Sequence, residues 1–221
     1  MNPATRIRKL LFLLTGKLFL ADPIRNRVYM WAWEHLQKMP EGCFVCDIGS
    51  RDSILPSFLA WRGFEVTSVE PDTRFTGAQM ANARKWGVSF EICPCDLCSI
   101  PSSRNFDCIL SIFSLQHAGE GDIESYLHTG KLLRSGGVIL TVNEFNSGET
   151  KWQRNRDDGD LRIYGTSDEQ TRIEKPLLDS GTVIFEKKYA SFVKRTGYRD
   201  LVFTGDPERA DIVFIAGKRR S

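Results

Sequence analysis

The chain has 221 residues, of which 41% are hydrophobic and 26% charged, and its formal net charge is +2. These values match an ordinary globular protein of one α/β domain. A charge this small excludes a strong electrostatic attraction to nucleic acid, so no nucleic-acid partner is expected.

An apolar run preceded by basic residues lies near the start of the chain. The basic residues are Arg6, Arg8 and Lys9, and residues 10–14 (LLFLL) follow them. The run is too short to span a bilayer, and no A-x-A-like cleavage site follows it. We expect an amphipathic helix that caps the domain or lines the ligand pocket. A helix on a membrane surface and a cleaved signal peptide are the alternatives.

Residues 24–39 predict a second helix, because apolar residues recur along one face and residues 40–42 (PEG) end it. Tyr29 and Trp33 could stack on a ligand there, or they could pack against the sheet. The two helices together predict an N-terminal helical cap over residues 1–40, followed by the main domain over residues 41–221.

The strongest pattern covers residues 44–72. An apolar strand (44–48) leads through a glycine turn (49–53) into a helix (54–61), and a second strand (64–69) ends at Glu70. A βαβ unit of this kind cradles a nucleotide. Its turn offers backbone N–H groups and a helix N-terminus to an anionic group. Glu70, 23 residues after Asp47, can accept hydrogen bonds from a ribose diol.

A third strand is expected over residues 88–93, after a helix over residues 74–86 that Gly87 ends. Asp96 follows this strand at its carboxyl end, where open α/β sheets hold ligands. It could accept a hydrogen bond from an exocyclic amine, or it could be a solvated or helix-capping aspartate.

The alternation of strands and helices continues after Asp96. Residues 106–111 and 138–142 are apolar and typical of buried parallel strands. A helix over residues 122–133, ended by the Gly136-Gly137 pair, separates them. The first of these strands runs into the segment that contains His117.

The chain becomes polar and charged at residues 143–160, which predicts a surface insertion reaching to about residue 165. The insertion could be a functional lid or a solvated loop. A helix over residues 166–178 should follow, with Thr166 or Ser167 as its N-cap, although Pro176 should shorten it. Residues 183–189 and 211–216 predict a hairpin-like pair of strands with a long connection.

The six cysteines lie mostly in or beside apolar strand-like runs, where a thiol behaves as a small hydrophobic group. We interpret them as reduced thiols, which indicates a cytoplasmic protein. The alternative is a metal site built from Cys93, Cys95 and Cys98, with Cys43 or Cys46 as the fourth ligand.

Three segments together resemble the class I S-adenosylmethionine-dependent methyltransferases. They are residues 45–50 (VCDIGS) with Glu70, residues 106–117, and residues 132–138 (LLRSGGV). The resemblance is looser to the members that act in sugar, polysaccharide or secondary-metabolite biosynthesis. It implies a seven-stranded, mostly parallel α/β sheet with helices on both faces and an antiparallel last strand. The chain departs from the family's D-x-G-x-G-x-G loop, since Arg51 and Ser53 occupy the later glycine positions.

The resemblance implies S-adenosyl-L-methionine as cofactor. The residues expected to bind it are Asp47, Gly49, Ser50, Arg51, Glu70, Pro71, Cys95, Asp96, Leu97, Ser111, Ile112 and Phe113. Arg51 could narrow the space for the methionine moiety, or it could reach the cofactor carboxylate. No metal is expected.

His117 is the first candidate for a catalytic base, because its pKa range suits removal of a proton from a hydroxyl group. Glu144, expected at the end of the fifth strand, is the second candidate. The expected reaction is O-methylation of a small molecule or glycan. A non-catalytic partner subunit with an eroded glycine loop is the alternative. A nicotinamide oxidoreductase is disfavoured, because a pyrophosphate needs the missing glycines.

Overall fold

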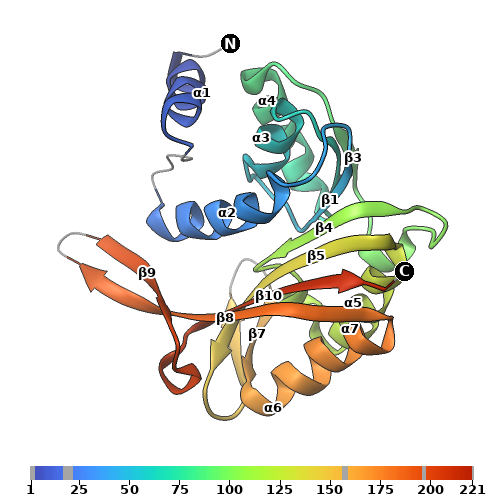
Figure 1. The fold of residues 1–221 in the computed structure, drawn as a ribbon, viewed down its shortest axis with the longest axis vertical. Coiled ribbons are helices and arrows are strands. Elements are labelled where there is room, and N and C mark those ends of the chain that lie inside the picture. Colours follow the sequence, from blue (N-terminus) through green and yellow to red (C-terminus); the bar gives the residue numbers. More distant parts are fainter. Residues whose placement is uncertain (1–2, 17–21, 156–158, 196–197, 221) are drawn as a thin grey trace.

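A single twisted sheet organises the computed structural model, which describes residues 3–16, 22–155, 159–195 and 198–220 (Figure 1). The strand order is β3-β2-β1-β4-β5-β10-β8-β9. The strands are β1 (Phe44–Ile48), β2 (Glu65–Val69), β3 (Glu91–Cys93), β4 (Phe106–Ile112), β5 (Leu133–Asn146), β8 (Thr182–Arg195), β9 (Tyr198–Thr204) and β10 (Ile212–Arg219). Strands β1 to β5 pair in parallel, whereas β10 runs antiparallel to both β5 and β8. The predicted α/β sheet with its antiparallel last strand is confirmed.

Helices cover both faces of this sheet (Figure 1). They are α1 (Pro3–Thr15), α2 (Pro23–Leu36), α3 (Leu55–Trp61), α4 (Thr76–Trp86), α5 (Asp122–Leu132), α6 (Thr166–Asp168) and α7 (Lys175–Asp179). Successive strand residues enter opposite cores, because side chains alternate along a strand. Val45 and Leu110 pack with α2 and α3, whereas Cys46 and Ile109 pack with α5 and α7.

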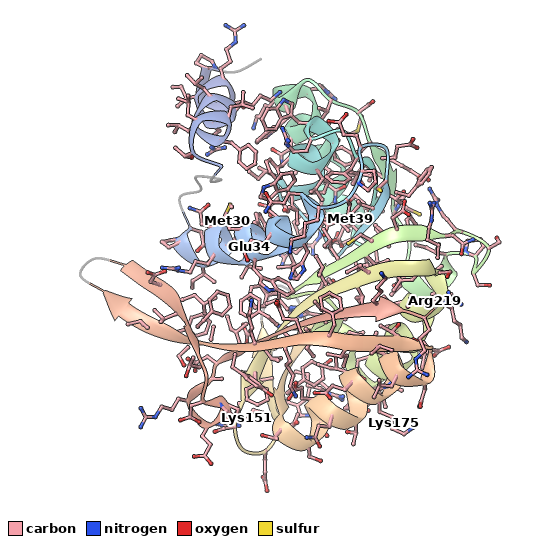
Figure 2. The ribbon with its side chains drawn as sticks, viewed as in Figure 1. Met30, Glu34, Met39, Lys151, Lys175 and Arg219 are labelled. Atoms are coloured by element: carbon pink, nitrogen blue, oxygen red, sulfur yellow. The ribbon has the colours of Figure 1, made fainter. Side chains whose placement is uncertain are left out.

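The N-terminal helices pack on the α3 side of the sheet. The carboxylate of Asp22 caps α2 by accepting hydrogen bonds from the backbone N–H groups of Ile24 and Arg25. Trp33 is 7% exposed and makes edge-to-face contacts with Phe12 and Phe58, so its predicted core role is confirmed. Figure 2 shows Met30 and Glu34 along α2, with Met39 just beyond its end.

The polar segment after β5 forms a hairpin, so its interpretation as a loop was wrong. Strand β5 continues to Asn146, and β6 (Lys151–Asn155) and β7 (Gly159–Gly165) then pair antiparallel. Strand β7 also pairs in parallel with the end of β5. Arg162 and Tyr164 are buried on β7, and both bond to Asp122. The polar composition therefore did not reveal that one face of β7 is buried, where Asp122 pairs with Arg162.

The segment after β7 is helical as predicted, but its details differ. Thr166 does not cap the helix through its side chain, and its hydroxyl instead donates to the carbonyl of Ser147. Residues Glu169–Glu174 form π-turns between α6 and α7, and the helix continues through Pro176 to Asp179. A wide turn before a proline relieves the clash of its ring with the carbonyl four residues earlier. Pro176 therefore does not end the helix.

The late strands β8 and β10 pair antiparallel, which confirms the predicted pairing, but β9 occupies part of their expected connecting loop. Strand β9 pairs antiparallel with β8 and adds an eighth strand to the path in the described part of the chain. Asp200 on β9 accepts hydrogen bonds from Arg27 on α2. The extra strand is thereby attached to the N-terminal helices.

The six cysteines are free thiols. The Sγ atoms of Cys93 and Cys95 lie 2.8 Å apart, and burial is the main cause that raises the pKa of Cys95 to about 11. Within the described ranges, no three His, Cys, Asp or Glu residues are arranged to hold a metal ion. Nor is any described helix both long enough and apolar enough to cross a bilayer.

Candidate functional site

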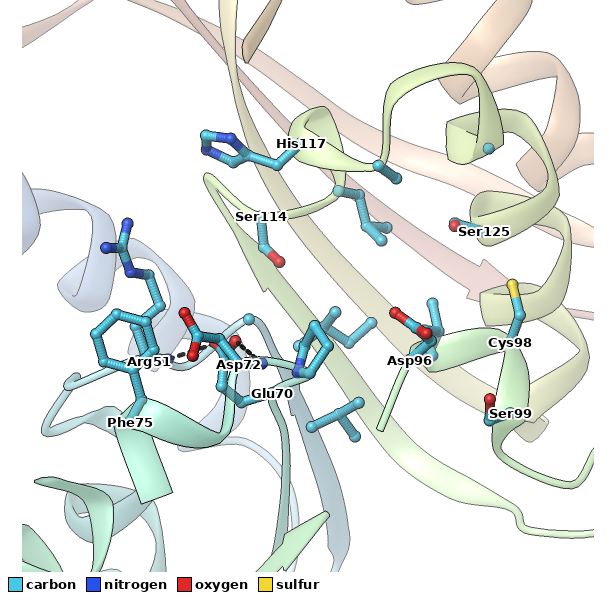
Figure 3. Close-up of a pocket in the computed structure, with 18 of the residues that line it drawn as sticks. Arg51, Glu70, Asp72, Phe75, Asp96, Cys98, Ser99, Ser114, His117 and Ser125 are labelled. Atoms are coloured by element: carbon cyan, nitrogen blue, oxygen red, sulfur yellow. Dashed lines mark hydrogen bonds between the residues drawn. The ribbon is translucent and has the colours of Figure 1, made fainter. Parts of the chain in front are cut away.

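A pocket of about 740 Å³ opens at the carboxyl ends of β1, β2 and β4 (Figure 3). The turn after β3 and the start of α5 complete its walls. Its residues come from segments that are distant in sequence but meet at one edge of the parallel sheet. Open α/β sheets bind their ligands at this edge, because the strand order reverses there and leaves a crevice.

Glu70 stands at the end of β2 with its carboxylate held in a fixed orientation. One oxygen accepts a hydrogen bond from the Arg51 backbone N–H (2.9 Å), and the other accepts from that of Asp72 (3.0 Å; Figure 3). The residue is only 6% exposed but lines the pocket. A carboxylate offers about four lone-pair sites, so these two bonds leave capacity for a ligand diol.

Gly49 at the end of β1 has no room for a side chain. Its φ is +68°, and a Cβ atom built on it would lie 1.9 Å from the Ser114 hydroxyl oxygen. The turn after β1 therefore packs directly on the segment that follows β4. This close approach brings two walls of the pocket together.

Arg51 and Phe113 are the residues other than glycine that adopt positive φ in the described part of the chain, at 45° and 53°. Both line the pocket. Such conformations cost of order 1–3 kcal/mol each, and they concentrate at functional sites. Arg51 occupies a glycine position of the predicted loop, and its guanidinium carbon lies 4.7 Å from the ring centre of Phe75 (Figure 3). The backbone at this position keeps the glycine-like conformation despite the change of residue.

This conformation at Arg51 has a measurable consequence. Arg51→Gly should be about 1 kcal/mol more stable than Arg51→Ala, because only the alanine Cβ is strained at positive φ. Both variants lose the contact with Phe75, so the difference between their free energies of unfolding reports the backbone strain at this position. Urea unfolding measures it, and Ala81→Gly within α4 is the control, where glycine should destabilise by about 0.5–1 kcal/mol. An alanine variant as stable as the glycine variant would contradict a left-handed Arg51.

Asp47 lies behind Gly49 and is almost completely buried. Ser50 donates a hydrogen bond from its hydroxyl to the Asp47 carboxylate (2.9 Å). Both residues line a second cavity of about 30 Å³, together with Tyr29 and Ser53, whose hydroxyl oxygens are 2.8 Å apart. Burial raises the pKa of Asp47 to about 7, and the negative charge of Glu70 adds to this rise.

The raised pKa of Asp47 predicts that pH affects stability. The folded state keeps a proton on Asp47 up to about pH 7, whereas the unfolded chain loses it near pH 4. The free energy of unfolding therefore decreases as the pH rises from about 4 to about 7. Asp47→Asn should become more stable than the wild type by roughly 2–4 kcal/mol at pH 8, and this gain should shrink toward pH 5. Urea unfolding at several pH values tests this, with the exposed Asp52→Asn as control. A gain independent of pH would contradict the assignment.

Asp96 and Leu97 follow β3 and line the pocket, as predicted. Asp96 precedes a 3₁₀ turn (Leu97–Ser99), but its side chain makes no capping hydrogen bond to that turn. The carboxylate lies at the pocket wall (Figure 3). The structure therefore does not support the helix-capping alternative for Asp96.

His117 also lines the pocket, at the end of a 3₁₀ turn (Leu115–His117) that follows β4. The backbone N–H of Leu115 donates to the Ser111 hydroxyl, and the backbone N–H of His117 donates to the Ser114 carbonyl. These bonds fix the turn that carries the imidazole. Figure 3 shows His117 and Ser114 on the same side of the pocket.

The structure brings together eight of the predicted site residues. Gly49, Arg51, Glu70, Pro71, Asp96, Leu97, Phe113 and His117 line the main pocket. Asp47, Ser50 and Ile112 line the small cavity. Ser111 is buried beneath the His117 turn, and Cys95 lies beside Cys93.

Glu144 is not in the pocket lining, and its expected place at a strand end was wrong. Strand β5 continues two residues further, because Glu144 pairs with Ile212 on β10. The backbone N–H of Glu144 donates to the side chain of the buried Gln116. Glu144 therefore supports the segment after β4 through its backbone.

Several pocket residues were not predicted. Asp72, Phe75, Ser114, Glu124 and Ser125 also form its walls. Asp72 and Ser114 each lie three residues after a predicted strand end, so extending each strand-end segment would have included them. Phe75 lies at the start of the helix predicted over residues 74–86. Glu124 and Ser125 come from the first turn of α5, and no local sequence signal marks them.

The fold matches solved methyltransferase structures. The chain superposes on an S-adenosylmethionine-dependent methyltransferase from Methanosarcina mazei with a TM-score of 0.64 and 16% identity, covering 85% of this chain and 97% of that one. It superposes on the 1,6-didemethyltoxoflavin-N1-methyltransferase from Burkholderia thailandensis, solved with S-adenosylhomocysteine, with a TM-score of 0.66 and 13% identity, covering 99% and 88%. The [4+2]-cyclase SpnF gives a TM-score of 0.64 at 14% identity, covering 98% and 96%.

No protein-family model matches this chain, and a search of curated proteins finds no relative. At these identities, the structural matches establish a Rossmann-like methyltransferase fold. The same fold carries both N-methylation and a cyclisation among these proteins. The reaction must therefore be argued from the residues of the pocket.

Proposed function

We propose that this chain is a methyltransferase that uses S-adenosyl-L-methionine. The observation that carries the proposal is the Glu70 carboxylate, held by two backbone N–H groups at the end of β2 and facing the pocket. A fixed acid at this position suits the two hydroxyl groups of a ribose. The pocket volume of about 740 Å³ is in the range of small-molecule and cofactor sites.

The pocket residues fit the parts of this cofactor. Glu70 would bind the ribose, while Asp96 would accept a hydrogen bond from the adenine amine beside Pro71 and Leu97. The turn after β1, with Arg51 at the pocket wall, would hold the charged methionine end. When bound, the cofactor supplies a methyl sulfonium, which is a strong electrophile.

Calorimetry with S-adenosylmethionine and S-adenosylhomocysteine tests the proposal. Both should bind with micromolar affinity, which is about −8 kcal/mol. NAD is the control ligand, because the loop lacks the glycines that a pyrophosphate requires. No heat at millimolar S-adenosylmethionine would overturn the proposal, and binding of NAD alone would favour an oxidoreductase.

We further propose that the acceptor is a hydroxyl group of a small molecule or glycan. His117 in the pocket supports this choice, because a neutral imidazole can take the hydroxyl proton as the new O–C bond forms. Nitrogen acceptors are the main competitor. Mass spectrometry after incubation with a panel of hydroxyl and amine acceptors distinguishes the two.

His117→Ala should lower kcat about 10²- to 10⁴-fold, because a positioned general base contributes that much. The Kd for S-adenosylmethionine should stay within about threefold, since the imidazole acts on the acceptor. His128→Ala is the control, because His128 is half-buried outside the pocket and bonds to the Ile100 carbonyl. An unchanged kcat, or a loss of cofactor affinity as large as the loss of kcat, would remove His117 from this role.

A second candidate is a non-catalytic binding or partner subunit. Arg51 favours it, because a long side chain lines the pocket at a position where the predicted loop has glycine. No binding of S-adenosylmethionine, together with no turnover of any acceptor, would support this candidate.

The six free thiols support a cytoplasmic location for either function.

A further inference from the structure

Helix α1 is apolar on two opposite faces. Its inner face packs on the body through Phe12, which is 5% exposed and contacts Trp33, Phe58 and Trp61. Its outer face carries four large aliphatic residues that are between 56% and 73% exposed: Ile7, Leu10, Leu13 and Leu14. A helix on a protein surface normally turns polar residues outward. An exposed apolar face of this kind marks an interaction site.

The charges on α1 are all positive. Arg6, Arg8 and Lys9 are its charged residues, and no acid lies between Pro3 and Thr15. Lys9 is engaged with the body, since its ammonium donates to the Trp86 carbonyl (2.7 Å). Arg6 is exposed beside the aliphatic face. The outer face therefore combines aliphatic side chains with an exposed arginine near its N-terminal end.

We propose that α1 lies in the plane of an anionic lipid surface, with its outer aliphatic face in the interface. An amphipathic helix with basic residues beside its apolar face binds such surfaces by burying apolar area and by attracting anionic headgroups. At 13 residues, the helix is about 20 Å long, and no described helix meets the requirements for spanning a bilayer. The helix therefore lies on the surface of the membrane.

A second copy of this chain is a weaker occupant of the same face. Two α1 helices facing each other would bring like charges together, and neither has an acid to pair with the other's arginines. Anionic lipid headgroups provide the missing negative charge. Docking would also leave the cofactor pocket open, because no described residue of α1 lines it.

Vesicle co-sedimentation of the full chain tests the proposal. The wild type should bind phosphatidylcholine vesicles that contain roughly one-third phosphatidylglycerol at least about tenfold more strongly than pure phosphatidylcholine vesicles. About 1 M salt, where the Debye length is about 3 Å, should remove most of this preference. Equal binding to both vesicles, or to neither, would overturn the proposal.

Matched variants distinguish vesicle binding through α1 from non-specific vesicle binding by the rest of the protein. Leu10→Gln with Leu14→Gln should weaken binding to the anionic vesicles at least about tenfold, because both side chains lose apolar burial in the interface. Leu178→Gln, on a residue that is 50% exposed in α7, should leave binding unchanged. If the double variant unfolds, Arg6→Gln with Arg8→Gln should instead reduce the preference for anionic lipid. Binding unaltered by both double variants would contradict the proposal. A wild-type dimer in light scattering would also contradict the proposal if the leucine double variant were monomeric.

Discussion

Replacing Asp122 with alanine should lower the free energy of unfolding by about 3–5 kcal/mol, the cost of breaking a buried ion pair. Asp122 is fully buried, and one of its oxygens accepts hydrogen bonds from Arg162 (2.8 Å) and the Tyr164 hydroxyl (2.9 Å). Its other oxygen accepts from Arg172 (2.7 Å). The alanine variant would leave the Arg162 guanidinium buried, with the exposed Glu120 as its remaining acidic partner among the described residues and the Trp152 ring 4.3 Å away. The loss is a large part of a typical stability of about 5–15 kcal/mol.

Urea unfolding measures this loss, and Asp179→Ala is the matched control. Asp179 pairs with Lys175 at 2.6 Å, but both side chains are more than half exposed, so its loss should cost less than about 1 kcal/mol. Asp122→Ala should also weaken ligand binding, because Gly121 and Glu124 beside it line the pocket. A cost at Asp122 no larger than at Asp179 would contradict the buried network.

Replacing Glu70 with alanine should raise the Kd for S-adenosylmethionine about 100-fold, if the proposed function is correct. Two hydrogen bonds from ribose hydroxyls to a carboxylate contribute about 1.5 kcal/mol each, and together they correspond to this factor. The variant also frees the N–H groups of Arg51 and Asp72, so the turns around the pocket lose their common acceptor.

Calorimetry measures the change, and Glu65→Ala provides the control at the opposite end of the same strand, where the side chain is exposed. Thermal unfolding of both variants without ligand separates a binding effect from a folding effect. A Glu70 variant that is folded and binds the cofactor like the wild type would show that the ribose is held elsewhere.

Strands β1 and β4 could be predicted because each is a continuous apolar run between turn residues. Strand β1 has the predicted bounds, and β4 extends only one residue beyond them, to Ile112. Glu70 could be placed because parallel strands present their carboxyl ends at one edge. These features depend on residues that are close in sequence.

The features that were missed depend on residues far apart in sequence. Arg162 can be buried in the hairpin only because Asp122, 40 residues earlier, neutralises it. Glu144 lies inside β5 only because Ile212 pairs with it. Ser114 enters the site because Gly49 leaves it space. None of these pairings leaves a periodic pattern within its own segment.

The π-turns over Glu169–Glu174 fix the number of residues between β7 and α7. They place Glu169 against Tyr189, whose hydroxyl donates to it at 3.2 Å, while Leu177 stays buried after them. A π-turn holds about one residue more than an α-turn for nearly the same rotation, so deleting one residue here would restore α-turns and keep the orientation of α7. Inserting a further residue would instead rotate the preceding segment by about 100° relative to α7. Glu169 and Leu177 could not then both keep their contacts. This segment should accept substitutions at its exposed positions and the loss of one residue, but not an insertion.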